Sequence, residues 1–273
     1  MEKIEFVKAV ASGNDFVIIN GQKNPKLKRY QLLAKNICRR KFGVGADGLL
    51  ILEKSKIADI KMLIFNPDGS EAQMCGNGIR CVALYLKSYL KIFKPQIKIE
   101  TKSGIIESEI NKDNVKVKIT QLKDLRLDIP IKINNRLLKV NFINTGVPHA
   151  VIFVEGLEKI DIVSLGRLIR NHKKFMPEGT NVDFVEVIDR DKIKVRTYER
   201  GVEDETFSCG TGVVASALIT DRRLENNDFF KKIDVYTRSA EVLKVYFRKQ
   251  NDNFKDVWLE GKARIVYKGV YYV

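Results

Sequence analysis

The chain carries one short pattern twice, and a pattern repeated at a long interval favours a fold made of two similar halves. The first copy, MCGNGIRCVAL, covers residues 74–84, and the second, SCGTGVVASAL, covers residues 208–218. Both begin with Cys-Gly-x-Gly and continue as small and aliphatic residues that end in Ala-Leu. Such a run is typical of a helix that opens at the glycine-rich segment. We therefore expect two related units, each with one thiol, Cys75 or Cys209, at the start of a helix.

A thiol at the start of a helix has unusual acid–base chemistry. The first turn leaves backbone N–H groups without partners, and the helix dipole adds partial positive charge there. This environment lowers the pKa of a cysteine thiol, to roughly 3.5–7.5 in favourable cases. If Cys75 and Cys209 flank the carbon next to a bound carboxylate, one thiolate can remove the α-proton while the other thiol delivers a proton to the opposite face. The pair therefore indicates racemisation or epimerisation without a cofactor.

The residues that follow each cysteine are suited to binding the carboxylate itself. Glycine lets a ligand approach bare backbone amides closely, and the start of a helix favours an anion. We expect the main-chain N–H groups of Gly76, Asn77, Gly210 and Thr211 to bind the reacting carboxylate. They would stabilise the charge that moves onto its oxygens as the α-proton leaves. The alternative is that these residues only cap their helices.

The dipeptide Glu199-Arg200 stands just before the second copy of the pattern. An arginine can hold a carboxylate through two parallel hydrogen bonds, which suits the distal end of a long diacid. Glu199 can pair with a substrate ammonium group and orient it. Adjacent opposite charges are also common on protein surfaces, so a surface ion pair is the alternative reading.

Composition narrows the class of protein. At 273 residues, with 44% hydrophobic and 30% charged residues, the chain has the composition of a soluble globular protein of one large or two modest domains. No apolar run approaches the roughly 20 residues of a membrane span. Residues 1–10 lack the apolar core of a signal peptide and have the pattern of an amphipathic strand. We therefore expect a cytoplasmic protein without a membrane partner.

The formal net charge of +15 raises the question of nucleic-acid binding. The lysines, however, alternate with acidic and aliphatic residues, as in IKINNRLLKV, and form no basic cluster with interleaved aromatic residues. This arrangement favours a solvated surface that helps to capture small anions. We expect no nucleic-acid partner.

Cysteine and histidine usage gives no sign of a metal site. Four cysteines and two histidines form no zinc pattern, and they are too few for a disulfide scaffold of this length. We expect Cys38 and Cys81 to be buried as small apolar side chains. The glycines of residues 43–48 fit a dinucleotide fingerprint only formally, because they follow a helical pattern and open a strand.

The order of the predicted elements repeats along the chain, which predicts an α+β fold of two duplicated units. In each unit one long helix lies among mostly antiparallel strands. The first half is predicted to contain strands at 4–10, 15–20, 45–54, 58–66, 97–110 and 114–120, and helices at 30–40 and 75–90. The second half is predicted to contain strands at 137–144, 149–155, 182–188, 192–199, 233–249, 256–261 and 263–273, and helices at 162–172 and from 209. A polar stretch at 120–123 is the predicted crossover between the two halves.

Together with both Cys-Gly-x-Gly copies, several longer motifs carry a family resemblance. They are SGNDF, GVGADG, FNPDGSEAQMCGNGIRC, TGVPH, GTNVDF, YERGVEDET and SCGTG, in this order. Through them the chain resembles the diaminopimelate epimerase family almost from end to end. The resemblance implies two pseudo-symmetric lobes, each a mostly antiparallel strand wrap around a central helix. It also implies interconversion of LL- and meso-2,6-diaminopimelate, in lysine and peptidoglycan biosynthesis, without pyridoxal phosphate or a metal.

The resemblance further implies how the lobes divide the chain. Residues 1–120 would form the lobe that carries Cys75, completed by the terminal strand 262–273. Residues 121–261 would form the lobe that carries Cys209. Members of the family are commonly homodimers, and Tyr267 matches a position at their dimer contact.

Four more site residues follow from matches to family motifs. Asn14, Asn66 and Asn181 match substrate ligands, although on residue type alone each is ordinary turn chemistry. His149 matches a residue important for activity, whereas a lone histidine after a turn is more often structural. One position departs from the family pattern, since Val147 replaces an asparagine before Pro-His and cannot donate a hydrogen bond to a distal carboxylate.

Other functions remain open at this point. The nearest is a related racemase or epimerase, of the proline or hydroxyproline type, that uses the same cysteine pair. Arg200 and the three asparagines favour a longer substrate with a second charged end. A thiol redox protein or a cysteine hydrolase belongs to a different class. A hydrolase would need a base beside one nucleophile, and it would leave the second cysteine unexplained.

Overall fold

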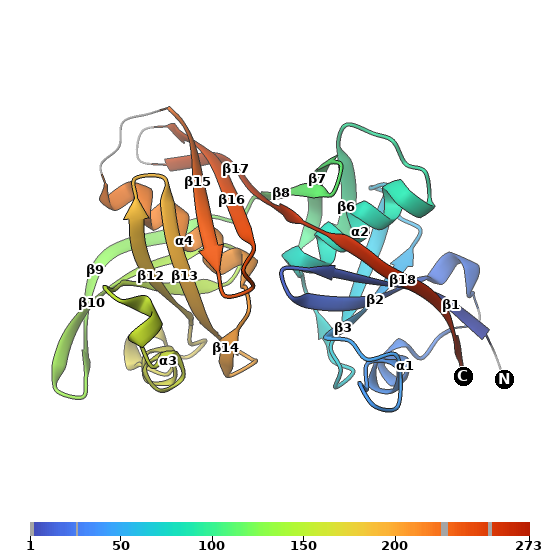
Figure 1. Ribbon diagram of the computed structural model, residues 1–273, viewed down its shortest axis with the longest axis horizontal. Helices are drawn as coiled ribbons and strands as arrows, with labels where there is room; N and C mark the ends of the chain where they lie inside the picture. Colours follow the sequence, from blue (N-terminus) through green and yellow to red (C-terminus); the bar gives the residue numbers. More distant parts are fainter. Residues whose placement is uncertain (1–2, 26, 225–228, 251–252) are drawn as a thin grey trace. The chain divides into compact units, whose positions relative to one another are not determined.

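The computed structural model describes residues 3–25, 27–224, 229–250 and 253–273, so the first two residues of the predicted amphipathic strand lie outside the described residues. The chain divides into two compact units. Unit 1 comprises Met1–Val117 and Gly261–Val273, and unit 2 comprises Lys118–Glu260. Each unit combines mostly antiparallel strands with helices (Figure 1), which confirms the predicted α+β class.

Unit 1 is a strand wrap around one long helix. The last strand, β18, pairs with β1 antiparallel, with Lys3 opposite Tyr272, so the first and last strands of the chain lie side by side in this unit (Figure 1). Parallel pairs join β2 to β3 and β4 to β6. The strands are β1 (Lys3–Ala11), β2 (Asn14–Asn20), β3 (Gly48–Glu53), β4 (Ile60–Phe65), β5 (Glu71–Ala72), β6 (Ile97–Thr101), β7 (Gly104–Asn111), β8 (Asn114–Ile119) and β18 (Arg264–Tyr272). The helices are α1 (Tyr30–Ile37), α2 (Gly76–Tyr89) and the short η1 (Gly21–Lys23).

The helix α2 is the centre of unit 1. All ten residues at 77–86 are buried, and they pack with apolar side chains of the surrounding strands. Those strands alternate buried and exposed residues, as Ile97, Lys98 and Ile99 show in β6. A second cluster joins α1 to the other face of β3 and β4. The start of α2 is therefore held rigidly by the core around it.

Unit 2 has the same plan. Its strands are β9 (Lys123–Ile133), β10 (Arg136–Asn144), β11 (Pro148–Phe153), β12 (Asn181–Asp189), β13 (Lys192–Glu199), β14 (Asp204–Thr206), β15 (Phe230–Thr237), β16 (Val242–Gln250) and β17 (Asn253–Lys262). Its helices are α3 (Ile162–Arg170), α4 (Gly210–Arg223) and the short η2 (Leu157–Lys159) and η3 (Lys173–Phe175). Parallel pairs join β11 to β12 and β13 to β15.

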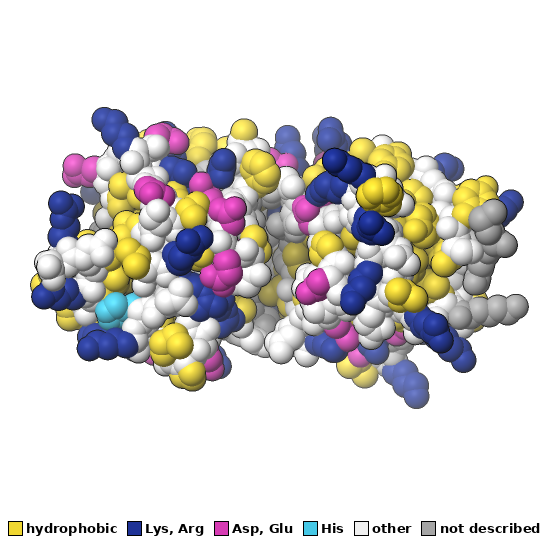
Figure 2. Space-filling view, turned by 90° about the horizontal axis from the view of Figure 1, so that it is seen from below, with side chains coloured by type: hydrophobic (Ala, Val, Ile, Leu, Met, Phe, Trp, Pro, Cys, Tyr) yellow, Lys and Arg dark blue, Asp and Glu magenta, His cyan; other side chains and the backbone are white. Residues whose placement is uncertain are grey.

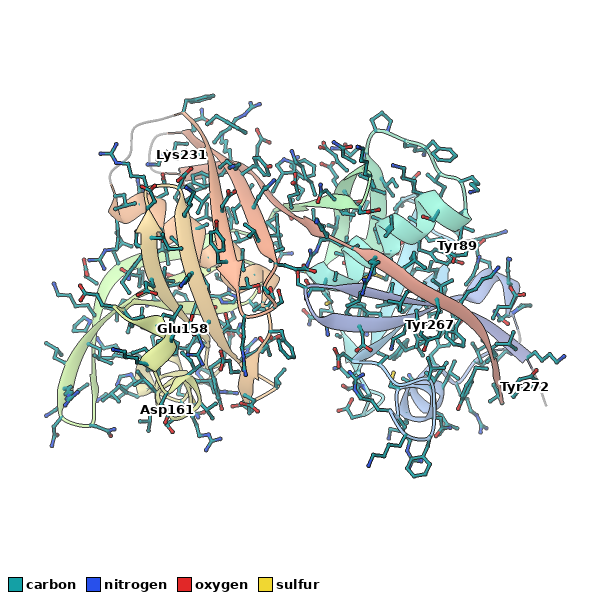
Figure 3. All side chains as sticks on the ribbon, in the orientation of Figure 1. Tyr89, Glu158, Asp161, Lys231, Tyr267 and Tyr272 are labelled. Carbon is teal, nitrogen blue, oxygen red and sulfur yellow. The ribbon has the colours of Figure 1, made fainter. Side chains whose placement is uncertain are left out.

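The helix α4 occupies the central place in unit 2. Residues 212–221 are all buried, and α4 contacts strands on several sides, including β11, β12 and β13. The helix α3 covers the opposite face of β12 and β13 with its own apolar cluster. Asp161 caps α3 by accepting a hydrogen bond from the Ser164 N–H at 3.1 Å (Figure 3).

The structure differs from the sequence prediction in several places, among them the short strands β5 and β14, which were not predicted. The segment 123–133, which follows the predicted crossover, forms the strand β9 and pairs with β10. Its apolar residues at 125, 127, 129, 131 and 133 alternate with polar residues and Pro130, which is a strand pattern that the sequence analysis overlooked. The helix α1 ends at Ile37, three residues earlier than predicted, with Cys38 as its C-cap. The two lobes predicted from the sequence, with boundaries after residues 120 and 261, remain a prediction.

The surface matches the mixed charge pattern of the sequence. On the face seen in Figure 2, Lys and Arg side chains are scattered among acidic and hydrophobic ones. None of the helices in the described ranges is long and apolar enough to cross a membrane.

The packing of α3 on β13 leads to a stability prediction. A Cβ added to Gly166 would lie 2.5 Å from the Cβ of Tyr198, which is fully buried. Gly166→Ala gains helix propensity, but overpacking costs more, so we expect a net loss of about 1–2 kcal/mol in the free energy of unfolding. Urea denaturation measures it. The control Leu168→Ala changes an exposed residue of the same helix, and equal effects in both variants would contradict the packing argument.

Candidate active site

Cys75 forms the N-cap of α2. Its backbone is extended, with φ −146° and ψ 114°, and its Sγ accepts a hydrogen bond from the Gly78 N–H at 3.4 Å. The thiol itself therefore interacts with the first turn, as the sequence predicts. The Sγ atom also lies 3.8 Å from Oδ1 of Asn14, at the start of β2. Two of the predicted site residues thus meet in unit 1.

Asn14 is held in one orientation by Asp47, a residue that the sequence analysis missed. The Nδ2 of Asn14 donates to Oδ2 of Asp47 at 2.9 Å, which leaves Oδ1 of Asn14 on the side of Cys75. Asp47 lies just before β3, which pairs parallel with β2, so the sheet brings the two residues together. The GADG motif that contains Asp47 was the only available signal.

A charged layer supports this arrangement. Asp15 and Asp47 exchange backbone-to-carboxylate hydrogen bonds of 3.1 Å, and Arg40 bridges both carboxylates. Lys8 lies 2.7 Å from Asp15 and is itself buried. Burial alone would raise the pKa of Asp15, but hydrogen bonds from Arg40 and Lys8 outweigh it and hold that pKa well below its usual range. The Asp47 carboxylate, which fixes Asn14, and the neighbouring Asp15 carboxylate thus have cationic partners.

Asn77 and Asn66 make local contacts. The Oδ1 of Asn77 accepts a hydrogen bond from the fully buried Arg80, which also donates to Ser12 Oγ at 2.9 Å. The side chain of Asn77 is therefore engaged in the core of unit 1, which leaves its main chain for the predicted role. Asn66 is exposed and donates to Ser70 Oγ at 3.0 Å within its own turn.

Cys209 forms the N-cap of α4, also with an extended backbone, at φ −107° and ψ 110°. Its side chain is more deeply buried than that of Cys75, and the residue is only 8% exposed. The Sγ atom lies 3.4 Å from Oγ1 of Thr211. The side chain of Thr211 is thus part of the site, whereas the sequence analysis gave this residue a main-chain role.

From Thr211 a chain of hydrogen bonds leads into the core of unit 2. Oγ1 of Thr211 lies 2.9 Å from Nε2 of His149, and Nδ1 of His149 lies 2.7 Å from Oδ2 of Asp183. Oδ1 of Asp183 accepts a hydrogen bond from Thr197 Oγ1 at 2.7 Å. His149 and Asp183 are fully buried. The sequence analysis identified His149 but missed Asp183 and Thr197.

Strand register explains why these residues meet. His149 on β11 lies opposite Asn181 on β12, so Asp183 is two residues further along the same strand and on the same face. Asp183 in turn pairs with Thr197 on β13. Gly212 completes the arrangement, since a Cβ there would lie 2.2 Å from Oδ1 of Asp183. The second glycine of the SCGTG motif therefore makes room for this carboxylate.

Asn181, Glu199 and Arg200 lie together at the ends of β12 and β13. Oδ1 of Asn181 accepts from the Arg200 N–H at 2.8 Å, and Nδ2 of Asn181 donates to the carbonyl of Pro148 at 3.0 Å. The guanidinium of Arg200 donates to the Glu178 carbonyl at 2.9 Å. The side-chain amide of Asn181 therefore connects the backbone of Pro148, just before His149, to the backbone of Arg200.

Burial dominates the acid–base properties of unit 2. It raises the pKa of Glu199, and Asp183 raises it further, while Thr206 and His149 act in the opposite direction. Burial also raises the pKa of Cys209 well above its usual value, followed by the negative charges of Glu199 and Asp183. The predicted lowering of the thiol pKa is therefore wrong for Cys209, because desolvation and two carboxylates outweigh the start of the helix.

The two other cysteines are buried, and the acidic residues that precede the site cysteines form ion pairs. All four thiols are free of disulfides, and Cys38 and Cys81 are buried, as expected. Glu71 and Glu205, each four residues before a site cysteine, form ion pairs with Lys102 and with arginines respectively. In the described ranges no group of three or more His, Cys, Asp or Glu side chains is placed to hold a metal ion.

The fold of the chain occurs in solved structures. A phenazine biosynthesis protein of the PhzF family from Bacillus anthracis matches 100% of both chains, with a TM-score of 0.72 and 19% sequence identity. A probable proline racemase from Agrobacterium radiobacter K84 matches 99% of this chain and 92% of its own, with a TM-score of 0.72 and 15% identity. At these identities the likeness shows the fold alone. It places the chain in the structural class that includes these proteins.

Sequence comparison narrows the class to one family. The family model described as diaminopimelate epimerase matches residues 6–123 and 141–266. A diaminopimelate epimerase from Aquifex aeolicus is 40% identical in an alignment 284 residues long, which covers 97% of each chain. The chain belongs to the diaminopimelate epimerase family and is an isomerase. The predicted family and enzyme class are confirmed.

The raised pKa of Glu199 gives a pH-dependent prediction. Above the ordinary pKa of 4.5, the unfolded chain ionises this residue while the fold still disfavours its charge, so the residue becomes increasingly destabilising until the pH passes its folded pKa. We expect Glu199→Gln to be more stable than the parent at pH 7.5, with the difference fading at pH 4. Urea unfolding at both pH values measures it.

Glu203→Gln is the control of opposite sign. Burial would raise the pKa of Glu203, but hydrogen bonds from Gly201, Arg170 and Tyr198 lower it. Its charge is therefore stabilising, and the loss of that charge should destabilise the chain at pH 7.5. The quantity to compare is the stability of Glu199→Gln minus that of the parent. A smaller difference at pH 7.5 than at pH 4 would contradict the raised pKa of Glu199.

Proposed function

We propose that the chain interconverts LL- and meso-2,6-diaminopimelate in lysine biosynthesis, with Cys75 and Cys209 as the two acid–base groups. The activity follows from the family to which the chain belongs. The observation that carries the mechanism is that each thiol forms the N-cap of the central helix of its unit. Both cysteines then stand beside amides suited to the carboxylate of an amino acid.

The proposed reaction moves one proton off the α-carbon and another onto its opposite face. In one direction the Cys209 thiolate removes the α-proton and the Cys75 thiol delivers its own, and the roles reverse in the other direction. The amides of Gly76, Asn77, Gly210 and Thr211 bind the α-carboxylate and stabilise the charge that builds up as the C–H bond breaks. The two thiols titrate as a coupled pair.

Two acid–base residues assist this chemistry in unit 2. His149 reaches Cys209 through Thr211, and Glu199 is close enough to influence the pKa of the thiol. A buried thiol with a raised pKa needs a neighbour that accepts its proton before it can act as a base. His149 and Glu199 support that role because both are ionisable and both lie beside the helix start.

The rest of the substrate is a second ammonium group and a second carboxylate. Arg200 suits the distal carboxylate, and Glu199 suits an ammonium group. Asn14, Asn66 and Asn181 supply amide donors and acceptors. Val147 offers no donor side chain, so more of the distal binding falls on Arg200. A proline-type racemase is the second candidate, but its solved relative supports the fold alone.

The mechanism is tested by isotope incorporation. Incubation of the protein with LL-diaminopimelate in deuterated water should give the meso isomer with deuterium at the inverted α-carbon. Cys75→Ala and Cys209→Ala should each lower kcat by about 100-fold or more, because each removes one of the two proton-transfer groups. Chiral chromatography and mass spectrometry measure both.

The control is Cys81→Ala, which removes a fully buried thiol six residues after Cys75 in α2. It should lower the melting temperature slightly and keep kcat within a few-fold of the parent. Full activity of either Cys75→Ala or Cys209→Ala would refute the two-thiol mechanism. Turnover of proline in place of diaminopimelate would favour the second candidate.

We also propose that the chain is a cytoplasmic homodimer that binds its small substrate without nucleic-acid or membrane partners. The strand β18 carries four apolar residues that are 45–54% exposed: Val266, Tyr267, Val270 and Tyr272. Figure 3 shows Tyr267 and Tyr272 on this strand. The Tyr267 ring packs edge-on against Phe6 at 5.9 Å between centroids, so its position is fixed by β1. A fixed aromatic side chain on an apolar strand is typical of an interface.

The dimer is tested with Tyr267→Glu. A charge buried in an apolar contact without a partner is costly, so this variant should shift the chain from dimer to monomer in sedimentation velocity. Tyr236→Glu changes a tyrosine on β15 of unit 2 that is 38% exposed, and it should leave the dimer intact. A parent chain that sediments as a monomer, or a Tyr267→Glu variant that remains dimeric, would contradict the assignment.

A further inference from the structure

We propose that Asp183 is a positioning residue that fixes the tautomer of His149, and that the Thr211 hydroxyl carries the thiol proton of Cys209 to that imidazole. The inference rests on the proposed function and deepens it, because it assigns roles to Asp183 and to the Thr211 side chain. It concerns four residues of unit 2 that are joined by contacts of 3.4, 2.9 and 2.7 Å.

The contact between Asp183 and His149 sets the direction of the hydrogen bonds that lead from Cys209 to His149. A carboxylate only accepts hydrogen bonds, and Oδ2 of Asp183 lies 2.7 Å from Nδ1 of His149. The proton of the neutral imidazole therefore resides on Nδ1, and Nε2 has a free lone pair. Since Nε2 faces Thr211 Oγ1 at 2.9 Å, the hydroxyl donates to the imidazole. The oxygen of Thr211 is then left to accept the S–H of Cys209 at 3.4 Å.

This direction allows a balanced proton transfer. The S–H bond of Cys209 breaks and an O–H bond forms on Thr211, while the original O–H proton of Thr211 moves to Nε2 of His149. The products are a thiolate and an imidazolium, and no further reactant is needed. The Asp183 carboxylate lies beside the new positive charge and stabilises it. The reverse transfer restores the thiol when Cys209 has to donate a proton.

The surrounding structure holds each member of the chain in place. Thr197 Oγ1 donates to Oδ1 of Asp183 at 2.7 Å. The Thr211 carbonyl accepts a hydrogen bond from Thr145 Oγ1 at 3.1 Å, which fixes the start of α4. The absence of a Cβ at Gly212 lets the carboxylate of Asp183 approach the helix. With His149 and Asp183 fully buried, water does not compete for these hydrogen bonds.

The surroundings of Cys209 also explain why proton transfer to His149 helps to form the thiolate. Three ionisable groups surround the site: the charges of Glu199 on β13 and Asp183 on β12 act on Cys209, and His149 on β11 is linked to it through Thr211. Two of the three are acidic, and burial opposes a thiolate as well. Among these three, His149 is the group whose protonation adds positive charge, so transfer to it offsets the repulsion that a thiolate meets.

The tautomer is tested directly by nitrogen NMR of imidazole-labelled protein. The chain has only two histidines, so His149 and His172 are easily separated by the variant His172→Gln. We expect the neutral ring of His149 to carry its proton on Nδ1, with Nε2 unprotonated. This measurement needs no substrate, so it is independent of the proposed reaction. A neutral His149 ring that carries its proton on Nε2 would overturn the inference.

The relay is tested through the reactivity of Cys209. Only the thiolate is alkylated by iodoacetamide, so the rate at each pH, followed on the Cys209 peptide by mass spectrometry, reports its ionisation. Thr211→Val keeps the side-chain shape but lacks the hydroxyl, and Thr211→Ser keeps the hydroxyl. We expect Thr211→Val to react about tenfold more slowly at pH 7.5, with a higher midpoint pH, and Thr211→Ser to react within about twofold of the parent. Equal rates for the two variants would refute the relay.

Asp183→Asn tests the positioning role. It preserves the size of the side chain but removes the charge that stabilises the imidazolium, so Cys209 should again react about tenfold more slowly and kcat should fall with little change in KM. Thr197→Val removes only the outer hydrogen bond and should retain most of the reactivity. Unchanged alkylation in a folded Asp183→Asn variant would overturn the role of Asp183. If that variant does not fold, the tautomer and the Thr211 pair still decide the inference.

Discussion

The start of a buried helix is the constraint on which the rest of this structure depends. The first turn of any α-helix leaves N–H groups without intrahelical partners, and burial makes such groups costly. In this chain α2 and α4 each run through the core of a unit, so their first turns open where strands surround them. A cysteine occupies the N-cap of both helices, where serine, threonine or aspartate is usual. The position thus combines a structural need with a reactive group.

The two helix starts repeat in sequence but differ in their surroundings. Cys75 is partly exposed and lies beside the neutral amide of Asn14, whose orientation is set by Asp47. Cys209 is buried and leads through Thr211 into an imidazole–carboxylate pair. A duplicated scaffold therefore supplies two equivalent cap positions, while the strands next to each cap supply different acid–base partners.

Unit 2 maintains this arrangement at a cost in stability. A buried imidazole, a buried carboxylate and a thiol with a raised pKa are all unfavourable unless their hydrogen bonds are satisfied. The contacts of Asp183 with Thr197 and His149 satisfy both of its oxygens. The acidic residues beside Cys75 have a different environment, because Asp15 and Asp47 lie near the surface and Arg40 forms an ion pair with each of them. Near Cys209, in contrast, His149 and Asp183 are fully buried.

Sequence alone determined the repeated motif, the α+β class, most of the helices and strands, and the two cysteines, because these depend on local periodicity and on residue type. It also predicted His149 and Asn181 as site residues through family motifs. It missed β9, although apolar residues occupy every second position from 125 to 133, and it did not identify Asp47, Asp183 or Thr197 as site residues.

Only the tertiary structure decided which side chains meet. The pairing of β11 with β12 and of β12 with β13 places His149, Asp183 and Thr197 in one row, although they are 34 and 14 residues apart in the chain. The same holds for the pKa of Cys209, which local sequence predicts to be low. Burial and neighbouring carboxylates raise it, since desolvation and Coulomb interactions depend on distance in space and not on distance along the chain.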